Sequence, residues 1–344
     1  MKKNFRTILQ SKPGVNKEPV EENFKYEECS YPDAELKTGE ILVKTLYLSV
    51  DPAMRCRMND DTGVQYMTAW KIGETIQGLG GVGVIINSQH PDFKGGDIVE
   101  SSFNWPWILY YTRSQDCNQE IRKVEKNIIG ENLSLPLTLL GLIGLTSYLG
   151  IKEKGHVTQG GNQTFVASGA AGACGSVAGQ VTRLEGCSNI VGICGTDEKC
   201  KFLREELGFN HAINYKHEDV GQRLSETCPN GVDVYFDNVG GSISDTVIEQ
   251  MSRDSHVILC GQISVYNKDV PYPPPMGDEA QKIILERNIT RERFLVVNYA
   301  DKFQSSLAKL LQWYKQGKIK IKETVAKGLE KAGFAFVSMM KGGI

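Results

Sequence analysis

Long hydrophobic runs and an excess of charge of either sign are both missing from this sequence of 344 residues. No apolar run approaches the roughly 18 residues that a membrane-spanning helix requires. The first residues, Met1-Lys-Lys-Asn-Phe-Arg6, are not followed by the apolar segment of a secretory signal. The formal net charge is −2, which gives no electrostatic reason to expect nucleic acid or an anionic membrane as a partner. We therefore expect no membrane span, no signal and no nucleic-acid partner.

Clustered metal ligands are also scarce. The nine cysteines include no Cys-x-x-Cys pair, and the first 130 residues hold a single histidine, His90, which we expect on a surface turn beside Pro91. Because a zinc site needs Cys, His or carboxylate ligands that converge, the sequence predicts no metal. Scattered thiols are typical of a reducing compartment, so we expect a cytoplasmic protein. Thiols within apolar runs, such as Cys194 and Cys260, are expected to be small buried hydrophobes.

The most informative segment that is present runs from Thr164 to Gly179. An apolar stretch up to Ser168 is followed by glycines at 169, 172 and 175 and then by small residues typical of a helix. This order predicts a strand, a tight turn and a helix N-terminus whose N–H groups bind a pyrophosphate. Glycine is needed there because a Cβ would block the phosphate or hold the helix away from the strand.

A strand–helix alternation surrounds this segment and continues for about 130 residues, which predicts βαβ units and a doubly wound parallel sheet with its ligand at the carboxyl ends of the strands. The expected strands are Thr164–Ser168, Ile190–Cys194, Ala212–Asn214, Val232–Phe236, His256–Cys260 and Phe294–Val297. The expected helices are Ser176–Glu185, Glu198–Leu207, Val220–Thr227 and Ser242–Met251.

The first 130 residues have a different pattern. Glu40–Val50 and Gly81–Ile86 are strand-like, and Phe93–Glu100 reads as a turn that leads into another strand. Such glycine-punctuated segments predict a partly closed barrel. The apolar stretch from Leu133 to Ile151 is expected to be a connecting helix. A chain of this length favours two domains, for which we expect residues 1–135, joined again by 299–344, and residues 136–298.

A proline-rich segment, Val270-Pro-Tyr-Pro-Pro-Pro-Met-Gly-Asp278, follows the fifth expected strand. Proline cannot join the interior of a sheet, so the segment must be a stiff loop. Two interpretations remain open: a plain connector and a loop that covers the substrate.

The end of the second expected strand indicates which dinucleotide binds. A carboxylate that holds the ribose 2′-hydroxyl of NAD should lie there, but the strand ends in Gly195 and Thr196. This neutral end leaves room for a 2′-phosphate, Lys199 supplies a cation, and Tyr215 adds a hydroxyl. NADP is therefore the expected cofactor. The alternatives are that Asp197 turns inward to bind NAD, or that Lys199 is only a solvated helix residue.

Several of these segments carry a resemblance to a known family. Leu48-Ser-Val-Asp-Pro52, Phe93-Lys-Gly-Gly-Asp97, Ala170-Ala-Gly-Ala-Cys-Gly175, Val234-Tyr-Phe-Asp-Asn-Val-Gly-Gly241 and Cys260-Gly-Gln-Ile-Ser264 are similar to zinc-independent medium-chain reductases. Residues 260–275, which include most of the proline-rich segment, and Arg287-Asn-Ile-Thr-Arg-Glu-Arg-Phe294 most resemble the 15-oxoprostaglandin 13-reductase and leukotriene B4 12-hydroxydehydrogenase branch. The resemblance implies a GroES-like, partly open β-barrel beside a Rossmann domain, in the α/β class.

The resemblance also implies NADPH-dependent reduction of the enone double bond of 15-oxo-prostaglandins, and hence a place in prostaglandin, lipid and fatty acid metabolism. A broader alkenal, enone or quinone reductase is the alternative of the same type. A non-catalytic NADPH-binding protein is the alternative of another class, since the family continues into a final strand beyond Ile344. The resemblance favours a monomer, while pairing of the strand expected at Phe294–Val297 leaves a homodimer open.

The residues that the resemblance assigns form two sets. Cofactor contacts are implied at Gly172, Ala173, Cys174, Gly175, Lys199, Tyr215, Asn238, Cys260, Gly261, Gln262, Ile263, Ser264, Val265, Tyr266, Phe294, Leu295 and Val296. Substrate contacts are implied at Phe103 and Asn104.

Tyr266 is the expected catalytic residue, because its O–H can stabilise the charge that develops on the substrate ketone; the alternative is that it only lines the pocket. Phe103, Trp105, Trp107 and Tyr272 are candidates to line an apolar channel, with core packing as the alternative for the tryptophans. Arg55 is expected in a structural ion pair, or else beside a substrate carboxylate.

Overall fold

The computed structural model describes the chain except for residues 1, 33–34, 64–66, 115–120, 272 and 344. Its contacts divide it into two compact units, Met1–Leu137 with Glu323–Ile344, and Thr138–Lys322. Residues 299–322, which the sequence analysis places with the first domain, thus belong to the second unit. This is a correction to the expected division.

The reason lies in helix α8 (Phe303–Lys315), which packs on α2 (Leu142–Lys154). The rings of Tyr148 and Trp313 meet edge to face with their centroids 5.8 Å apart. Beyond α8, the Gln180 side chain donates to the carbonyl of Lys320 and accepts from its N–H, at 2.9 and 2.8 Å.

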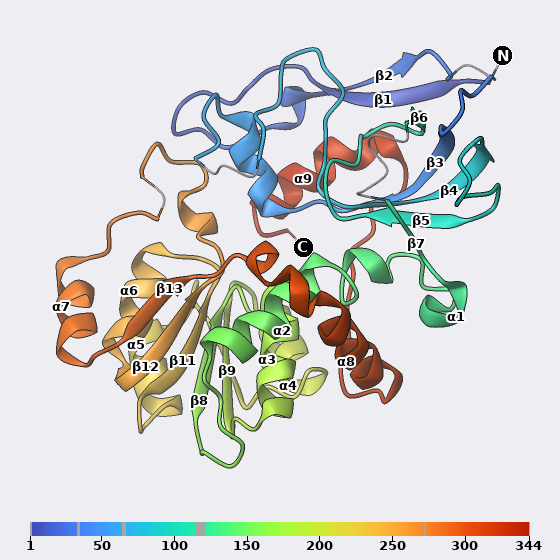
Figure 1. Cartoon of the computed structure of the whole chain (residues 1–344). Coiled ribbons are helices and arrows are strands. Elements are labelled where there is room, and N and C mark those ends of the chain that lie inside the picture. The colour runs from blue at the N-terminus through green and yellow to red at the C-terminus, as the bar shows by residue number, and fades with distance from the viewer. Residues whose placement is uncertain (1, 33–34, 64–66, 115–120, 272, 344) are drawn as a thin grey trace. The chain divides into compact units, whose positions relative to one another are not determined.

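The second unit is built on a six-stranded parallel sheet with the order β10-β9-β8-β11-β12-β13 (Figure 1). Each adjacent pair is parallel, so the connections are crossovers, as the doubly wound prediction requires. The strands are β8 (Thr164–Ser168), β9 (Asn189–Cys194), β10 (His211–Asn214), β11 (Val232–Asp237), β12 (Met251–Leu259) and β13 (Thr290–Arg293).

Helices cover both faces of this sheet. Alternate residues of β8 show the arrangement: Val166 joins the core under α5, α6 and α7, while Phe165, next in the chain, points to the opposite face. On that opposite face, α2 brings Gly150 against Phe236 and Ile258. The helices not yet given are α3 (Ala173–Glu185), α4 (Asp197–Glu205), α5 (Val220–Thr227), α6 (Gly241–Glu249) and α7 (Asp278–Glu286).

The last strand is displaced from its expected position. It is expected at Phe294–Val297, but β13 covers Thr290–Arg293, and Val296 begins the 3-10 helix η6 (Val296–Lys302). β13 forms the edge of the sheet and is only partly buried, so its residues are polar and carry no apolar signal. The apolar residues that follow it belong to the loop.

The first unit contains an antiparallel sheet with the order β6-β3-β4-β5-β7 and a separate pair, β1-β2. Isolated bridges of Arg6 with Ile108 and of Ile8 with Thr75 connect β1 to segments beside the sheet, and a third bridge joins Gln77 to Pro106. The strands are β1 (Asn4–Leu9), β2 (Phe24–Cys29), β3 (Ile41–Leu48), β4 (Gly81–Ser88), β5 (Ile98–Ser101), β6 (Tyr110–Arg113) and β7 (Arg122–Lys123).

Two tryptophans form the core of this unit. Trp105 and Trp107 are fully buried, and the Trp105 indole N–H donates to Thr45 Oγ1 at 3.0 Å. A Cβ at Gly81 would lie 2.1 Å from the Trp105 ring, so glycine is required there. Core packing is thus what both tryptophans do, and neither lines an open channel in this unit. Tyr272, the other aromatic candidate, lies outside the described residues.

The remaining helices are short or peripheral, except for α9, which returns to the first unit and places Phe336 in its core. The expected helix within Leu133–Ile151 is split at Gly141, which precedes α2. The elements are η1 (Glu21–Asn23), η2 (Pro52–Met58), α1 (Lys126–Ile129), η4 (Leu135–Leu137), η5 (Ile263–Val265), η7 (Leu329–Lys331) and α9 (Ala332–Met340).

Candidate functional site

The glycine turn between β8 and α3 forms a cradle for a phosphate group. Gly169 has φ = 58°, and Gly172, which precedes the helix, offers no side chain to cap it. A Cβ at Gly175 would lie 2.6 Å from the Gly169 carbonyl oxygen, so only glycine allows this close packing. The N–H groups of Ala173 and Cys174 lie in the first turn of α3, where no intrahelical acceptor is available. The positive end of α3 can therefore receive a pyrophosphate.

Asp237, the last residue of β11, holds the neighbouring loops in place and is fully buried. Its Oδ1 accepts hydrogen bonds from the hydroxyls of Ser168 and Tyr235, at 3.1 and 2.9 Å, and from the Gly240 N–H at 2.9 Å. Its Oδ2 accepts from the Ser244 hydroxyl at 2.8 Å. Burial, reinforced by the charge of Asp237, raises the pKa of Tyr235 well above its usual value, so this tyrosine remains a donor.

Asn238 links three strand ends. Its side-chain amide donates to the Ser168 carbonyl at 2.8 Å, and its N–H donates to the Ser168 hydroxyl at 3.0 Å. Its own carbonyl accepts from the Ile263 N–H in the loop after β12. The loops of β8, β11 and β12 are thereby fixed against one another.

The loop Cys260–Tyr266 contains the expected catalytic tyrosine. The Tyr266 hydroxyl accepts a hydrogen bond from the Gln262 N–H at 3.3 Å and lies 3.0 Å from the place where a Cβ of Gly261 would be. This hydrogen bond fixes the hydroxyl oxygen beside Gly261.

Cys260 meets the start of α3. Its hydrogen bond with Cys174, together with burial, raises the pKa of the Cys260 thiol, so the thiol stays protonated. Cys260 is half-buried, in contrast to the fully buried Cys194. Further along the loop, the exposed Ser264 hydroxyl donates to the Val239 carbonyl at 2.6 Å, and Val265 is buried.

Phe294, Leu295 and Val296 follow β13 at the same edge of the sheet. The Phe294 N–H donates to the Leu259 carbonyl at 3.0 Å, and its buried ring stacks on Tyr299 with the centroids 5.4 Å apart. The structure thus brings the predicted cofactor residues to the carboxyl ends of the six strands, all within the second unit.

A cationic subsite lies beyond the ends of β9 and β10. The Tyr215 ring rests on Gly195, where a Cβ would lie 3.0 Å from the ring. Lys199 is half-buried in the first turn of α4, whose N-cap Thr196 accepts the Lys199 N–H at 3.2 Å. Burial lowers the pKa of Lys199, and the positive charge of Lys216 lowers it further. Lys199 with Lys216 nearby, beside a tyrosine, suits an anion such as a phosphate.

Asp197 does not take the position that NAD would require. Its Oδ1 accepts a hydrogen bond from the Asn214 side chain at 2.7 Å, so the carboxylate is bound to the end of β10. The subsite beside Gly195 therefore fits a 2′-phosphate better than a ribose 2′-hydroxyl.

The two expected substrate residues lie in the first unit. Phe103 is half-buried and packs against the core cluster that contains Trp107. Asn104 is exposed with φ = 57°, a conformation that asparagine tolerates, and its Oδ1 accepts from Arg57 at 3.2 Å. Arg55 is buried and donates to Asn59 Oδ1 and to the Lys17 carbonyl, a structural role through hydrogen bonds.

Comparison with known families covers both units. Residues 6–117 match a family described as the N-terminal domain of oxidoreductase, and residues 173–315 match one described as zinc-binding dehydrogenase. The chain is 32% identical to NADPH-dependent curcumin reductase of Escherichia coli (strain K12), over 99% of this chain and 94% of that protein. It is 35% identical to prostaglandin reductase 1 of Rattus norvegicus, over 94% of this chain and 92% of that protein.

The fold agrees with that of a solved relative. The crystal structure of CurA in complex with NADPH from Vibrio vulnificus has a TM-score of 0.88 and 32% identity, and the match covers 99% of this chain and 96% of that one. The chain belongs to the zinc-independent medium-chain dehydrogenase/reductase family. This family carries the expected Rossmann sheet and N-terminal domain, so the predicted α/β fold class is confirmed.

Within this family, the segments that resemble the 15-oxoprostaglandin 13-reductase branch predict a protein similar to prostaglandin reductase 2. The comparisons confirm the family but not that particular protein. Curcumin reductase and prostaglandin reductase 1 are similar to the chain at comparable identities.

In the described part of the chain, the structure contains no helix that is long and apolar enough to cross a membrane.

One matched family has zinc in its description, so we tested the donor set. Among the described residues there is no group of three or more His, Cys, Asp or Glu placed to hold a metal. His90 lies on a turn, as expected, but its side chain is only 8% exposed and packs on Phe93. The side chains of the described residues therefore do not fit a zinc ion.

Three functional residues were missed from the sequence: Asp237, Asn214 and Lys216. Asp237 has a signal, since a carboxylate directly after the apolar residues Val234–Phe236 ends a buried strand where the loops meet. Asn214 and Lys216 follow the third strand, and no spacing rule assigns them a partner. Their roles depend on the parallel pairing of β10 with β9.

Proposed function

We propose that the protein is an NADPH-dependent reductase of the carbon–carbon double bond of α,β-unsaturated ketones. The observation that carries the proposal is the site at the carboxyl edge of the sheet, where the glycine cradle, the cationic subsite and the Tyr266 hydroxyl gather. The names of the relatives support it, since one is an NADPH-dependent curcumin reductase and another is a prostaglandin reductase. The cofactor is NADPH.

The residues present fit this cofactor at both ends. Gly172, Ala173, Cys174 and Gly175 would hold the pyrophosphate, and Lys199 and Tyr215 would hold the 2′-phosphate. Asn238 and the loop Cys260–Tyr266 would hold the nicotinamide end, together with the segment that follows β13. When bound, the reduced nicotinamide supplies a hydride to the β-carbon of the enone.

The chain must stabilise the negative charge that then develops on the ketone oxygen. Tyr266 would do so by donating its O–H, while the Gln262 N–H holds the hydroxyl oxygen in position. A proton from solvent at the α-carbon completes the reduction. Phe103 and Asn104 are the proposed substrate contacts of the first unit.

The finer proposal concerns the substrate. The resemblance of Val270–Asp278 to prostaglandin reductases favours 15-oxo-prostaglandins, whereas the curcumin reductase relative favours a broader range of enones. A panel with a 15-oxo-prostaglandin, curcumin, a short alkenal and a quinone separates these alternatives by NADPH consumption at 340 nm, with NADH as the cofactor control. Lack of NADPH consumption with every compound would favour a non-catalytic binding protein.

The Tyr266→Phe variant tests the mechanism. We expect turnover to fall by roughly ten- to a thousandfold, the scale of losing one donor to a developing oxyanion. The NADPH dissociation constant should stay close to that of the wild type, because the substitution removes only the hydroxyl and leaves the ring in place. Tyr314→Phe, on α8, is the matched control and should change neither value. Wild-type turnover in Tyr266→Phe would remove the tyrosine from the mechanism.

A further inference from the structure

Asn214 is the last residue of β10 and is 1% exposed. Its polar groups all have partners on neighbouring elements. The side-chain N–H donates to Asp197 Oδ1 at 2.7 Å, the side-chain oxygen accepts from the Lys216 N–H at 3.2 Å, and the backbone N–H donates to Glu218 Oε2 at 2.7 Å.

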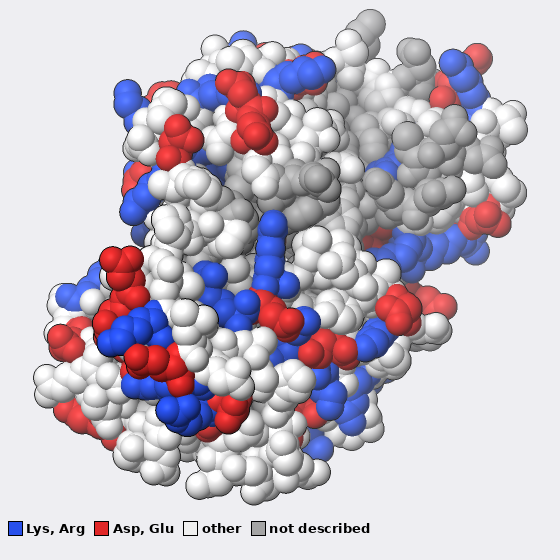
Figure 2. Space-filling view, turned by 60° about the vertical axis from the view of Figure 1, so that its left-hand side comes forward, with Lys and Arg blue, Asp and Glu red and all other residues white. Residues whose placement is uncertain are grey.

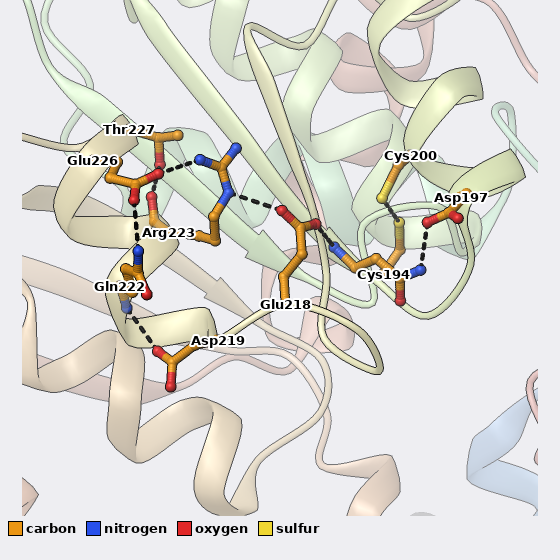
Figure 3. A network of polar contacts seen from close by, with 10 residues as sticks. Cys194, Asp197, Cys200, Glu218, Asp219, Gln222, Arg223, Glu226 and Thr227 are labelled. Atoms are coloured by element: carbon orange, nitrogen blue, oxygen red, sulfur yellow. Dashed lines mark hydrogen bonds and ion pairs between the residues drawn. The ribbon is translucent and has the colours of Figure 1, made fainter.

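Glu218 is itself held in place, because it accepts a hydrogen bond from Arg223 Nε at 2.8 Å (Figure 3). The same view shows Asp197 turned toward this network, beside the contact of Cys194 with Cys200. The Asn214 side chain therefore cannot turn away from Asp197 without losing its hydrogen bonds to Asp197 and to the Lys216 N–H, and Glu218 holds the backbone at this position.

Asp197 is an exposed carboxylate in the first turn of α4, in the same turn as Lys199. Its other neighbours in the chain are Thr196, which caps the helix, and Gly195, on which Tyr215 rests. If the Asp197 carboxylate were released from Asn214, it would have opposite effects on the binding of the two dinucleotides. It would repel a 2′-phosphate, and it would accept a hydrogen bond from a ribose 2′-hydroxyl.

We infer that Asn214 is a specificity-determining residue: it binds the Asp197 carboxylate to the end of β10 and so keeps the subsite selective for NADPH over NADH. Asn214 acts through Asp197 and is a positioning residue. The inference rests on the proposed cofactor and adds the reason for its selectivity. Figure 2 shows that Lys and Arg are interspersed with Asp and Glu on the face that it draws.

The experiment measures the dissociation constants of NADPH and NADH by isothermal titration calorimetry on the full chain. For Asn214→Ala we expect NADPH to bind roughly tenfold more weakly, since the released Asp197 carboxylate repels the phosphate across a solvated distance. NADH should bind equally well or better. Asp197→Ala should keep the selectivity of the wild type, and Asn214→Ala with Asp197→Ala should restore it to within about twofold, because the released charge is gone.

Asp219→Ala is the matched control. Asp219 is also a carboxylate at a helix N-terminus and accepts the Gln222 N–H at 2.7 Å, but it lies at α5. Its loss should leave the ratio of the two constants unchanged. If Asn214→Ala does not fold, Asn214→Ser serves in its place, since serine is too short to reach Asp197 but keeps a hydroxyl beside the Lys216 N–H.

The outcomes separate the possibilities. Equal weakening of both cofactors in Asn214→Ala, without recovery in the double variant, would show that the Asn214–Asp197 bond is only a structural brace, and would overturn the inference. A wild-type chain that binds neither cofactor would instead overturn the proposed function.

Discussion

At the residue scale, Asp237 shows how one buried side chain organises a site on several loops. Its two oxygens accept hydrogen bonds from two strands, from the turn after β11 and from α6. A buried carboxylate is costly unless each of its oxygens has donors, and here both do. The loops that hold the cofactor residues therefore depend on a residue that we do not expect to touch the cofactor.

We predict that Asp237→Ala lowers the free energy of unfolding by about 3–5 kcal/mol, because several buried donors lose their acceptor at about 1–3 kcal/mol each. Urea unfolding followed by circular dichroism measures this change. Asp233→Ala, on the same strand, is the control: Asp233 is half-buried and accepts one N–H, from Thr164 at 2.7 Å, so its loss should cost about 1 kcal/mol. Similar losses in the two variants would contradict the assigned role of Asp237.

Single residues differ in how well their roles can be predicted from the sequence. Gly175 and Lys199 follow from motif spacing, because a phosphate site requires glycines at a strand–helix turn and a cation near the second strand. Asn214 does not, since its partner Asp197 precedes it by 17 residues and the two meet only because β10 lies beside β9. A contact between residues at the ends of two neighbouring strands cannot be predicted from local sequence patterns.

At the element scale, the start of α3 has to approach the turn before it closely. We predict that Gly175→Ala lowers stability by roughly 1–3 kcal/mol, because its Cβ meets backbone atoms that cannot move aside. NADPH affinity should fall as well, since the helix N-terminus is displaced. Thermal unfolding with and without NADPH measures both effects.

Gly221→Ala is the matched control for this substitution. Gly221 is the second residue of α5, and a Cβ there would lie 3.4 Å from its nearest neighbours, an ordinary contact. Alanine favours the helix over glycine by up to about 1 kcal/mol, so this variant should be as stable as the wild type or more stable. A loss in Gly221→Ala as large as that in Gly175→Ala would show that the clash is not the cause.

Elements with strong periodic signals are predicted well, and edge elements are not. The strand at Thr164–Ser168 and the helix at Val220–Thr227 agree with the prediction residue by residue. β13 was placed four residues too late because its own residues, Thr290-Arg-Glu-Arg293, are polar. An edge strand keeps one side in contact with water, so hydrophobicity fails as a marker there.

At the scale of the whole molecule, buried thiols make the fold sensitive to alkali. Burial raises the pKa of Cys187 to about 12 and that of Cys228 to about 11. Above about pH 9, the unfolded chain releases these protons while the native state retains them, so the unfolded state binds fewer protons and stability falls as pH rises. The loss runs from about pH 9 to about pH 11 for Cys228, and further for Cys187.

We predict that Cys228→Ala flattens this decline by up to about 1.4 kcal/mol per pH unit between pH 9 and 11. Urea unfolding at pH 7, 8, 9 and 10 tests it, and the slopes of variant and wild type should coincide below pH 8. Parallel slopes throughout would mean that Cys228 does not control the alkaline loss.

The division of the whole chain was predicted only in part. Motifs locate the second unit but say little about where the chain leaves it, and residues 299–322 stay with that unit through Trp313 and Lys320. Such contacts join segments more than a hundred residues apart. The sequence of an amphipathic helix shows that one face is buried, but it does not show which part of the protein buries that face.

The contact of the Tyr215 ring with Gly195 also affects attempts to change the cofactor preference of the enzyme. The usual route to an NAD-preferring variant is to place an acidic residue at the end of the second strand, but here any side chain at that position would push against the aromatic ring. Because the Tyr215 ring is 44% exposed, it can shift by the few tenths of an ångström that a new side chain requires, so a change of dinucleotide at Gly195 also changes the position of the tyrosine that faces the phosphate subsite.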